Sequence, residues 1–449
     1  MTRRNFLLGL LTFAWLLLFA AKYVHVFRTE HFQGGGRFSF YLAETFLRLS
    51  LAREVAGSPA AWIYQGIALD SFKDLGKTYP GNGRILLETG IILYEMGRKE
   101  EALRSFNLGG RDVRCAALAG VLKDIYRENY SCSLNAVKTR KTLEGGFSGW
   151  FLNRALLHLY EKAGNRTLVG EIREEGESGG SRLFFRLSLI AAVLFLLELS
   201  GIVFWIVFFL RLRKTRGGES LPQPPCGFAD TWLVFVSWEI LQILAGKYLL
   251  KAFPDLSSIP LLVVVFTLNY AVALLFIFAL FRQKFPGFLA SLGLQGLRLK
   301  AAALAGFGGF LGALPLVTIA AVLSRLLFKG VNFSSNPVIP LIAGRMNFWD
   351  QALLFLLVAC LAPLFEEILF RGLIYGVLRK TLKPWPAILL VSFLFSFLHV
   401  DPAGLLPIFV LGVLLAWLYE RTGSLLSSVV LHALWNGLVF FLAGTFFRN

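Results

Sequence analysis

Cysteine and histidine are scarce in this chain, which narrows the chemistry that it can carry. There are four cysteines and five histidines in 449 residues. None of the cysteines has the spacing of a metal site, and only Cys115 and Cys132 share a region in which they could pair in an oxidising compartment. We interpret the cysteines chiefly as small buried residues. His399 and His432 are the two histidines of the apolar C-terminal half.

Acidic residues are also few. The 28 Asp and Glu are outnumbered by 45 Lys and Arg, for a formal net charge of +17. In a soluble protein this excess would suggest nucleic acid, but the sequence has no basic and aromatic platform or recognition motif. The basic residues instead gather at the ends of apolar runs, as in the cytoplasmic loops of membrane proteins. We therefore expect a membrane partner and no nucleic-acid partner.

Apolar residues are abundant: 56% of the chain is hydrophobic, and the mean hydropathy is +0.63. A run of about twenty apolar residues is long enough to cross a bilayer as a helix. Residues 183–449 contain eight such runs, which predict an all-α, multi-span membrane domain. The runs lie at about 185–210, 230–252, 257–281, 301–327, 349–378, 384–400, 404–420 and 424–446.

Residues 1–28 predict a further membrane helix. Two arginines precede an apolar run that ends near Ala21. Because no small-x-small cleavage site follows, we expect an uncleaved anchor with a cytoplasmic N-terminus rather than a signal peptide. Residues 29–182 are then extracytoplasmic, and the basic loop at 211–218 returns to the cytoplasm, in agreement with the positive-inside rule.

Residues 29–182 predict a soluble helical module. The region is mixed and charged, with helical periodicity and no spanning segment. Two stretches recur about 34 residues apart, and Gly90, Ala102 and Phe106 in the second have the spacing seen in tetratricopeptide repeats. A generic bundle of helical hairpins is the alternative. Because such repeats usually present a concave face to a peptide, the module is a candidate site for a protein partner.

Two adjacent glutamates, Glu366 and Glu367, lie within the apolar run at 349–378. A carboxylate in hydrocarbon costs several kcal/mol unless it is paired or faces a wet cavity. Glu367 and Arg371 have i,i+4 spacing and can pair on one helix face, whereas Glu366 points about 100° away. We therefore assign Glu366 to chemistry, and Glu367 with Arg371 to structure.

Three polar residues in the later runs can join Glu366. A helix rises about 1.5 Å per residue, and on this scale Glu366, His399 and Asn436 lie at a similar depth. His432 is slightly nearer the cytoplasm. Glu366 beside a histidine can activate a water as general base. His432 and Asn436 can donate hydrogen bonds to the oxyanion of a tetrahedral intermediate.

These residues resemble the motifs of a known family. Three patterns are similar in order and spacing to those of the CAAX protease and bacteriocin-processing family (CPBP, also called Abi): Glu366-Glu367-x-x-x-Arg371, Phe395-x-x-x-His399 and His432-x-x-x-Asn436. The resemblance covers about residues 260–446 and leaves out the helical module. It implies an eight-helix intramembrane protease of a bacterial inner membrane, which hydrolyses a peptide bond of a membrane-associated protein or peptide.

The resemblance also implies roles for the motif residues. Glu366 and His399 would activate the water, and His432 and Asn436 would form the oxyanion hole. The remaining members would support the site: Glu367, Arg371 and Phe395.

A zinc ion is the open alternative, because the family has also been classed as metalloproteases. Glu366, His399 and His432 would hold the ion with one position open for water. The chain has no H-E-x-x-H pattern, and asparagine is an unusual zinc ligand. We therefore favour a metal-free route.

Two other functions compete with the protease. One is a non-catalytic membrane scaffold or immunity protein that keeps the same fold. The other is a transporter whose buried charges line a solute path. A transporter of this kind would have inverted repeats with interrupted helices in matching positions, and the sequence has no such symmetry.

Overall fold

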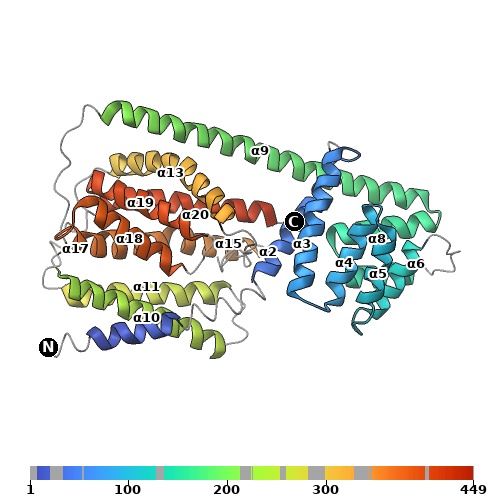
Figure 1. Cartoon of the computed structure of the whole chain (residues 1–449), viewed down its shortest axis with the longest axis horizontal. Helices are drawn as coiled ribbons and strands as arrows, with labels where there is room; N and C mark the ends of the chain where they lie inside the picture. The colour runs from blue at the N-terminus through green and yellow to red at the C-terminus, as the bar shows by residue number, and fades with distance from the viewer. Residues whose placement is uncertain are drawn as a thin grey trace. The chain divides into compact units, whose positions relative to one another are not determined.

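The computed structural model is helical throughout the residues that it describes (Figure 1). The described residues are 8–20, 34–52, 55–127, 136–212, 224, 226–252, 259–281, 299–327, 342, 346–399 and 404–447. The chain divides into two compact units. We call residues 31–193 the helical module, and residues 1–30 with 194–448 the membrane unit. The all-α expectation is confirmed.

The helical module is built from short antiparallel helices around an aromatic and aliphatic core. Phe72, Phe106 and Trp150 are among its fully buried side chains. The Asn82 side chain caps the N-terminus of α4 (Gly83–Glu95) by accepting hydrogen bonds from the backbone N–H groups of Arg84 and Ile85. The helices are α2 (Gly34–Leu49), α3 (Pro59–Thr78), α4 (Gly83–Glu95), α5 (Lys99–Gly109), α6 (Ala116–Tyr126), α7 (Ala136–Gly146), α8 (Gly149–Lys162) and the start of α9 (Arg166–Leu212).

The α4–α5 hairpin shows why a glycine occurs at position 90. A Cβ atom there would lie 2.5 Å from the Phe106 ring, so only glycine lets the two helices approach this closely. Ala102 on the same hairpin is fully buried. This packing agrees with the small and large residues of a tetratricopeptide repeat and equally with a generic hairpin. The repeat assignment therefore stays a prediction.

The membrane unit is made of longer, more apolar helices. Among the described residues, six helices are long and apolar enough to cross a membrane: Arg166–Leu210, Leu262–Ala279, Leu299–Leu327, Phe348–Leu378, Leu405–Thr422 and Leu425–Thr445. The helices at Leu8–Ala20 and Pro384–Leu398 are shorter, and the run expected at 230–252 is helical without being among the six. The chain is a multi-pass membrane protein, and the expected count of eight spans is not confirmed.

The helices of the membrane unit that follow α9 are numbered in chain order. They are α10 (Phe228–Ala252), α11 (Ile259–Phe281), α13 (Leu299–Leu327), α15 (Phe348–Phe355), η2 (Leu356–Leu361), α16 (Ala362–Glu367), η3 (Ile368–Tyr375), α17 (Gly376–Leu378), α18 (Pro384–Leu398), α19 (Leu405–Thr422) and α20 (Leu425–Phe447).

The span that carries the two glutamates is not a uniform α-helix. Two π-helical segments, η2 and η3, flank the single α-helical turn α16. Pro363 lies at the start of α16 and has no backbone N–H, so it cannot continue the α-helical ladder. Just before it, the Ala362 N–H donates to the Leu357 carbonyl, five residues back. Wide turns of this kind occur often at functional sites.

Candidate functional site

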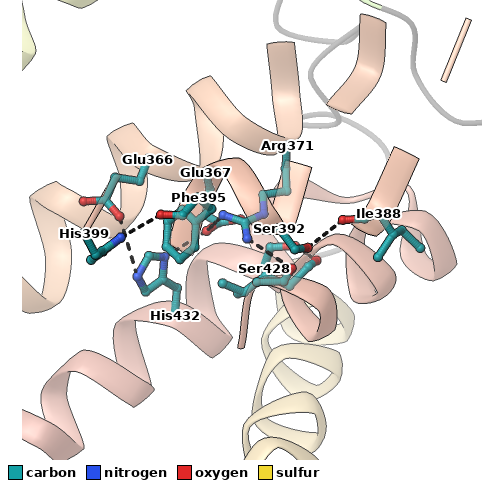
Figure 2. Close-up of polar contacts among 11 residues, drawn as sticks. Glu366, Glu367, Arg371, Ile388, Ser392, Phe395, His399, Ser428 and His432 are labelled. Atoms are coloured by element: carbon teal, nitrogen blue, oxygen red, sulfur yellow. Dashed lines mark hydrogen bonds and ion pairs between the residues drawn. The ribbon is translucent and has the colours of Figure 1, made fainter. Parts of the chain in front are cut away.

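A buried ion triad lies at the centre of the membrane unit. The Glu367 carboxylate accepts a hydrogen bond from Arg371 Nη1 at 2.9 Å, and its same oxygen, Oε1, lies 2.8 Å from His432 Nδ1 (Figure 2). All three side chains are buried, and those of Glu367 and Arg371 are fully so. The predicted pairing of Glu367 with Arg371 is confirmed. A charge this deep needs such partners, because an isolated one would be very costly.

Arg371 is held by two further contacts from neighbouring helices. Its Nη2 donates to the Gly412 carbonyl of α19 at 3.2 Å, and its guanidinium carbon lies 4.6 Å from the centre of the Phe395 ring of α18. A Cβ at position 412 would lie 3.1 Å from the Ser392 Cβ, so glycine allows α18 and α19 to approach each other here. Arg371 therefore ties three helices together around the triad.

Glu366 lies on the accessible side of His432. Its Oε2 is 3.8 Å from His432 Nε2, and 19% of its side chain is exposed. His432 thus stands between the two glutamates, with one ring nitrogen towards each. The Glu367 contact has hydrogen-bond length, whereas 3.8 Å is too long for a direct hydrogen bond. A polar gap of this size can be bridged by a water.

His399 and Asn436 lie near the triad but form different contacts from those expected. The ring nitrogen Nδ1 of His399 lies 2.8 Å from the Phe395 carbonyl, and the Asn436 amide donates to the Val358 carbonyl at 3.0 Å. Among the described residues, neither has a hydrogen bond or ion pair with Glu366. The Phe395 ring lies between the histidines, with its centroid 4.7 Å from that of His399 and 5.8 Å from that of His432.

The geometry refines the division of labour between the glutamates. Helix periodicity alone predicted that Glu367 pairs with Arg371. It also predicted that Glu366, and not Glu367, contacts the other polar residues of the site. In the structure Glu367 is also the hydrogen-bond partner of His432, so it fixes the orientation of that ring. Glu366 has the longer contact and the greater exposure. Both carboxylates therefore lie against the His432 ring, and Glu366 is the more exposed of the two.

The expected zinc ligands do not form a cluster. Within the part of the chain that the structure describes, no three His, Cys, Asp or Glu side chains gather closely enough to hold a metal ion. His399 is exposed, and its Nδ1 is at hydrogen-bond distance from a backbone carbonyl. As arranged here, Glu366, His399 and His432 do not fit a zinc ion, and we derive no step through one.

Two aromatic residues that sequence reasoning missed clamp the segment next to Glu366. The Phe365 ring packs against Trp238 of α10 at 5.2 Å and is stacked on Tyr270 of α11 at 4.7 Å. Because Phe365 directly precedes Glu366, these contacts restrict the backbone that carries the acid. The aromatic enrichment of the chain gave no signal for these two positions, since contacts between separate helices have no local pattern.

A second polar cluster lies at the C-terminal end of the span that carries the two glutamates. The Tyr375 hydroxyl donates to Glu420 at 2.6 Å, and Arg379 forms two hydrogen bonds of 3.1 Å with the same carboxylate. These contacts join η3 and the turn after α17 to α19. They fix the end of the span and do not reach the triad.

Comparison with known proteins finds one family model that matches part of the chain. Residues 348–438 match the model of the family described as type II CAAX prenyl endopeptidase Rce1-like. We call these residues the Rce1-like segment. It contains every predicted site residue, including both glutamates and both histidines. The clamp residues Trp238 and Tyr270 lie outside it, as does the whole helical module.

Individual relatives match about a fifth to a quarter of the chain. The "UPF0177 protein YxdF" of Lactococcus lactis is 32% identical over 20% of this chain and 50% of its own length. The "Uncharacterized 24.3 kDa protein" of Escherichia coli is 32% identical over 24% of this chain and 52% of its own length. The "Putative membrane peptidase YdiL" of Bacillus subtilis is 31% identical over 19% of this chain and 36% of its own length. The chain thus spans about half or less of each relative, and no solved structure matches.

Proposed function

We propose that the protein is an intramembrane endopeptidase that hydrolyses a peptide bond of a membrane-associated protein or peptide. The observation that carries this proposal is the position of His432 between two carboxylates of unequal exposure. The match of the Rce1-like segment and the similarity to a relative named as a membrane peptidase support the reaction class.

The residues suit hydrolysis by an activated water. A water in the gap between Glu366 and His432 would give a proton to the Glu366 carboxylate as its oxygen attacks the substrate carbonyl carbon. Glu366 then returns the proton to the leaving amine when the carbon–nitrogen bond breaks. Low exposure of the surrounding side chains strengthens these electrostatic interactions.

His432 and Asn436 are the proposed oxyanion donors. In its protonated form His432 donates through both ring nitrogens, to Glu367 on one side and to the developing oxyanion on the other. Asn436 has one N–H engaged with the Val358 carbonyl, and its amide retains a second. We place His399 at the entrance of the site, where its exposed ring can contact the substrate or the water.

Substitution of Glu366 tests this proposal. Glu366→Gln should lower kcat/KM by about 10²–10⁴-fold, the usual contribution of a general base. The assay uses the purified full-length protein in bilayer nanodiscs with a quenched-fluorescent farnesylated CAAX peptide and its unprenylated twin. The matched control is Glu198→Gln, because Glu198 is another glutamate of an apolar helix and bonds to Thr318.

Two results would reject the proposal. One is a cellular function that survives both Glu366→Gln and His432→Ala intact, while neither the wild type nor the variants cleave the peptides, which would favour a non-catalytic scaffold or immunity protein. The other is cleavage that a zinc chelator abolishes and added zinc restores, which would replace the metal-free route. Cleavage of the farnesylated peptide alone would identify a prenylated substrate.

We propose the following setting for the reaction. The protein lies in a bacterial inner membrane, with a cytoplasmic N-terminus and the helical module outside the cytoplasm. The named relatives come from bacteria, and the distribution of basic residues supports this topology. The module would bind a substrate or partner protein. A cysteine introduced in α5 should react with a membrane-impermeant reagent added to intact cells. Labelling that occurs only after the cells are lysed would contradict this topology.

A further inference from the structure

One helix of the helical module changes character halfway along its exposed face. In the first half of α3, Trp62, Ile63 and Ile67 are between 41% and 64% exposed. In the second half, the exposed residues are charged: Asp70, Lys73, Asp74 and Lys77. The opposite face is buried in the module core through Ala68, Leu69, Phe72 and Leu75. Among the described residues of the module, none covers this exposed apolar half of α3.

The end of α2 and Ala52, which precede α3 in the chain, pack closely against the backbone of α9. A Cβ at Gly180 of α9 would lie 2.6 Å from the Ala52 backbone nitrogen and 2.8 Å from the Arg48 carbonyl oxygen. Between this contact and α3, the Val55 N–H donates to the Ala52 carbonyl and the Ser58 N–H to the Val55 carbonyl, so the described residues stay close to each other. Figure 1 shows the end of α2 and the beginning of α3, both blue, beside the green α9. The apolar half of α3 is thus the half next to Gly180.

The same point of α9 lies just before its lipid-facing surface begins. Phe185, Leu189 and Val193 are exposed apolar residues spaced four apart, and Phe185 is about 8 Å along the helix from Gly180. Arg182 and Arg186 are exposed at this boundary. Basic and aromatic residues at the start of an apolar run are typical of the headgroup region of a bilayer.

We propose that the first half of α3, with Trp62, Ile63 and Ile67, lies in the headgroup and acyl boundary of the bilayer that α9 enters. The partner is a lipid surface. The packing at Gly180 sets the distance between this lipid surface and α3. The exposed apolar face of α3 continues the exposed apolar surface of α9. Tryptophan and isoleucine on one face of a helix are suited to this position. The charged second half of α3 remains in water, and the contact holds the module at the membrane surface.

A photo-crosslinking experiment tests the proposal. The full-length protein carries p-benzoylphenylalanine in place of Ile63, and it is reconstituted in vesicles of phosphatidylethanolamine and phosphatidylglycerol. The control sites are Val113, which is 89% exposed elsewhere in the module, and Lys73 on the charged half of α3. We expect lipid adducts at position 63 to exceed those at position 113 by about tenfold, because an interfacial residue remains against lipid.

Each other outcome overturns the proposal. Equal lipid adducts at positions 63, 73 and 113 would show no interfacial contact. Crosslinks from position 63 to a second copy or to another protein would identify a protein-binding face instead. Substitution at exposed positions should leave the core intact, which circular dichroism checks. A companion variant, Trp62→Ser with Ile67→Ser, should lose most of the lipid adducts at position 63, and their retention would also reject the proposal.

Discussion

The two units each bury a glutamate four residues from an arginine, with very different surroundings. In the membrane unit, Arg371 Nη1 lies 2.9 Å from Glu367, and both side chains are fully buried. In the helical module, Arg84 Nε lies 3.0 Å from Glu88, which is buried, but 51% of the Arg84 side chain is exposed. The spacing and the distance are almost the same, so local sequence does not distinguish the pairs.

The difference lies in the number of partners. Glu367 also contacts His432, and Arg371 also contacts Gly412 and Phe395. Glu88 has only Arg84 as an ion-pair partner among the described residues, and burial raises the pKa of Glu88 to about 7 although the Arg84 charge opposes this. Glu367 thus has several converging polar partners, whereas Glu88 has one half-exposed arginine, whose charge does not offset the effect of burial on the pKa of Glu88.

The largest expected effect separates the two pairs directly. Glu367→Gln removes the charge that compensates the buried Arg371, and it should lower the free energy of unfolding by about 3–5 kcal/mol. Glu88→Gln should instead raise it at pH 7, by up to about 3 kcal/mol, because the neutral amide removes the cost of ionising a buried carboxyl whose pKa is about 7 in the folded state. Unfolding of the purified protein in mixed micelles of increasing sodium dodecyl sulfate measures both.

A conservative variant shows whether the geometry of Arg371 matters in addition to its charge. Arg371→Lys keeps the positive charge but cannot span Glu367 and the Gly412 carbonyl together. If Arg371→Lys were as stable as the wild type and Glu367→Gln were also neutral, the triad would contribute nothing to folding.

The sequence predicted one contact of the candidate site and missed others. The Glu367–Arg371 pair follows from i,i+4 spacing, which local geometry satisfies. The approach of His432 to Glu367 does not follow from sequence spacing, because it depends on how α20 packs beside the π-helical segments. An estimate of depth from the α-helical rise also fails to describe these segments, because it assumes a uniform rise per residue. Pro363 was the available signal for that irregularity. The clamp of Trp238 and Tyr270 on Phe365 comes from α10 and α11, which the motifs do not include.

The fold shows the same division. Hydropathy and periodicity correctly predicted an all-α, multi-pass protein, because composition alone sets whether a segment can be buried in lipid. The number of spans does not follow from hydropathy in the same way. The helix at Pro384–Leu398 is shorter than a bilayer requires, and α10 carries several polar residues.

The second expected effect is a pH dependence of the helical module. The pKa of Glu88 is about 7 in the folded state against 4.5 for an ordinary glutamate. The folded state therefore binds a proton more tightly, and stability falls as pH rises from about 4.5 to 7, by about 3 kcal/mol in total. Burial also raises the pKa of Glu44, which acts with the same sign.

Hydrogen exchange of peptides covering α4, corrected for the intrinsic rate at each pH, measures this dependence in the full-length protein. Glu88→Gln should flatten it. Glu100→Gln is the control, because that side chain is 93% exposed and should leave the slope unchanged. A slope of opposite sign, with the module more stable at pH 7 than at pH 5, would show that Arg84 outweighs burial after all.

The smallest expected effect compares the packing of glycines in the two units. A Cβ at Gly306 of α13 would lie 2.6 Å from the Val430 Cβ and 2.7 Å from the Ser427 carbonyl oxygen of α20, whereas one at Gly120 of α6 would meet nothing within 4 Å. Gly306→Ala should therefore cost about 1–3 kcal/mol of unfolding free energy through overpacking. Gly120→Ala should raise the unfolding free energy by about 0.5–1 kcal/mol, because alanine favours a helix interior. Unfolding in mixed micelles measures the first and hydrogen exchange of α6 the second. Equal effects of the two substitutions would mean that α13 and α20 can separate without cost, and that close helix packing does not distinguish the membrane unit from the module.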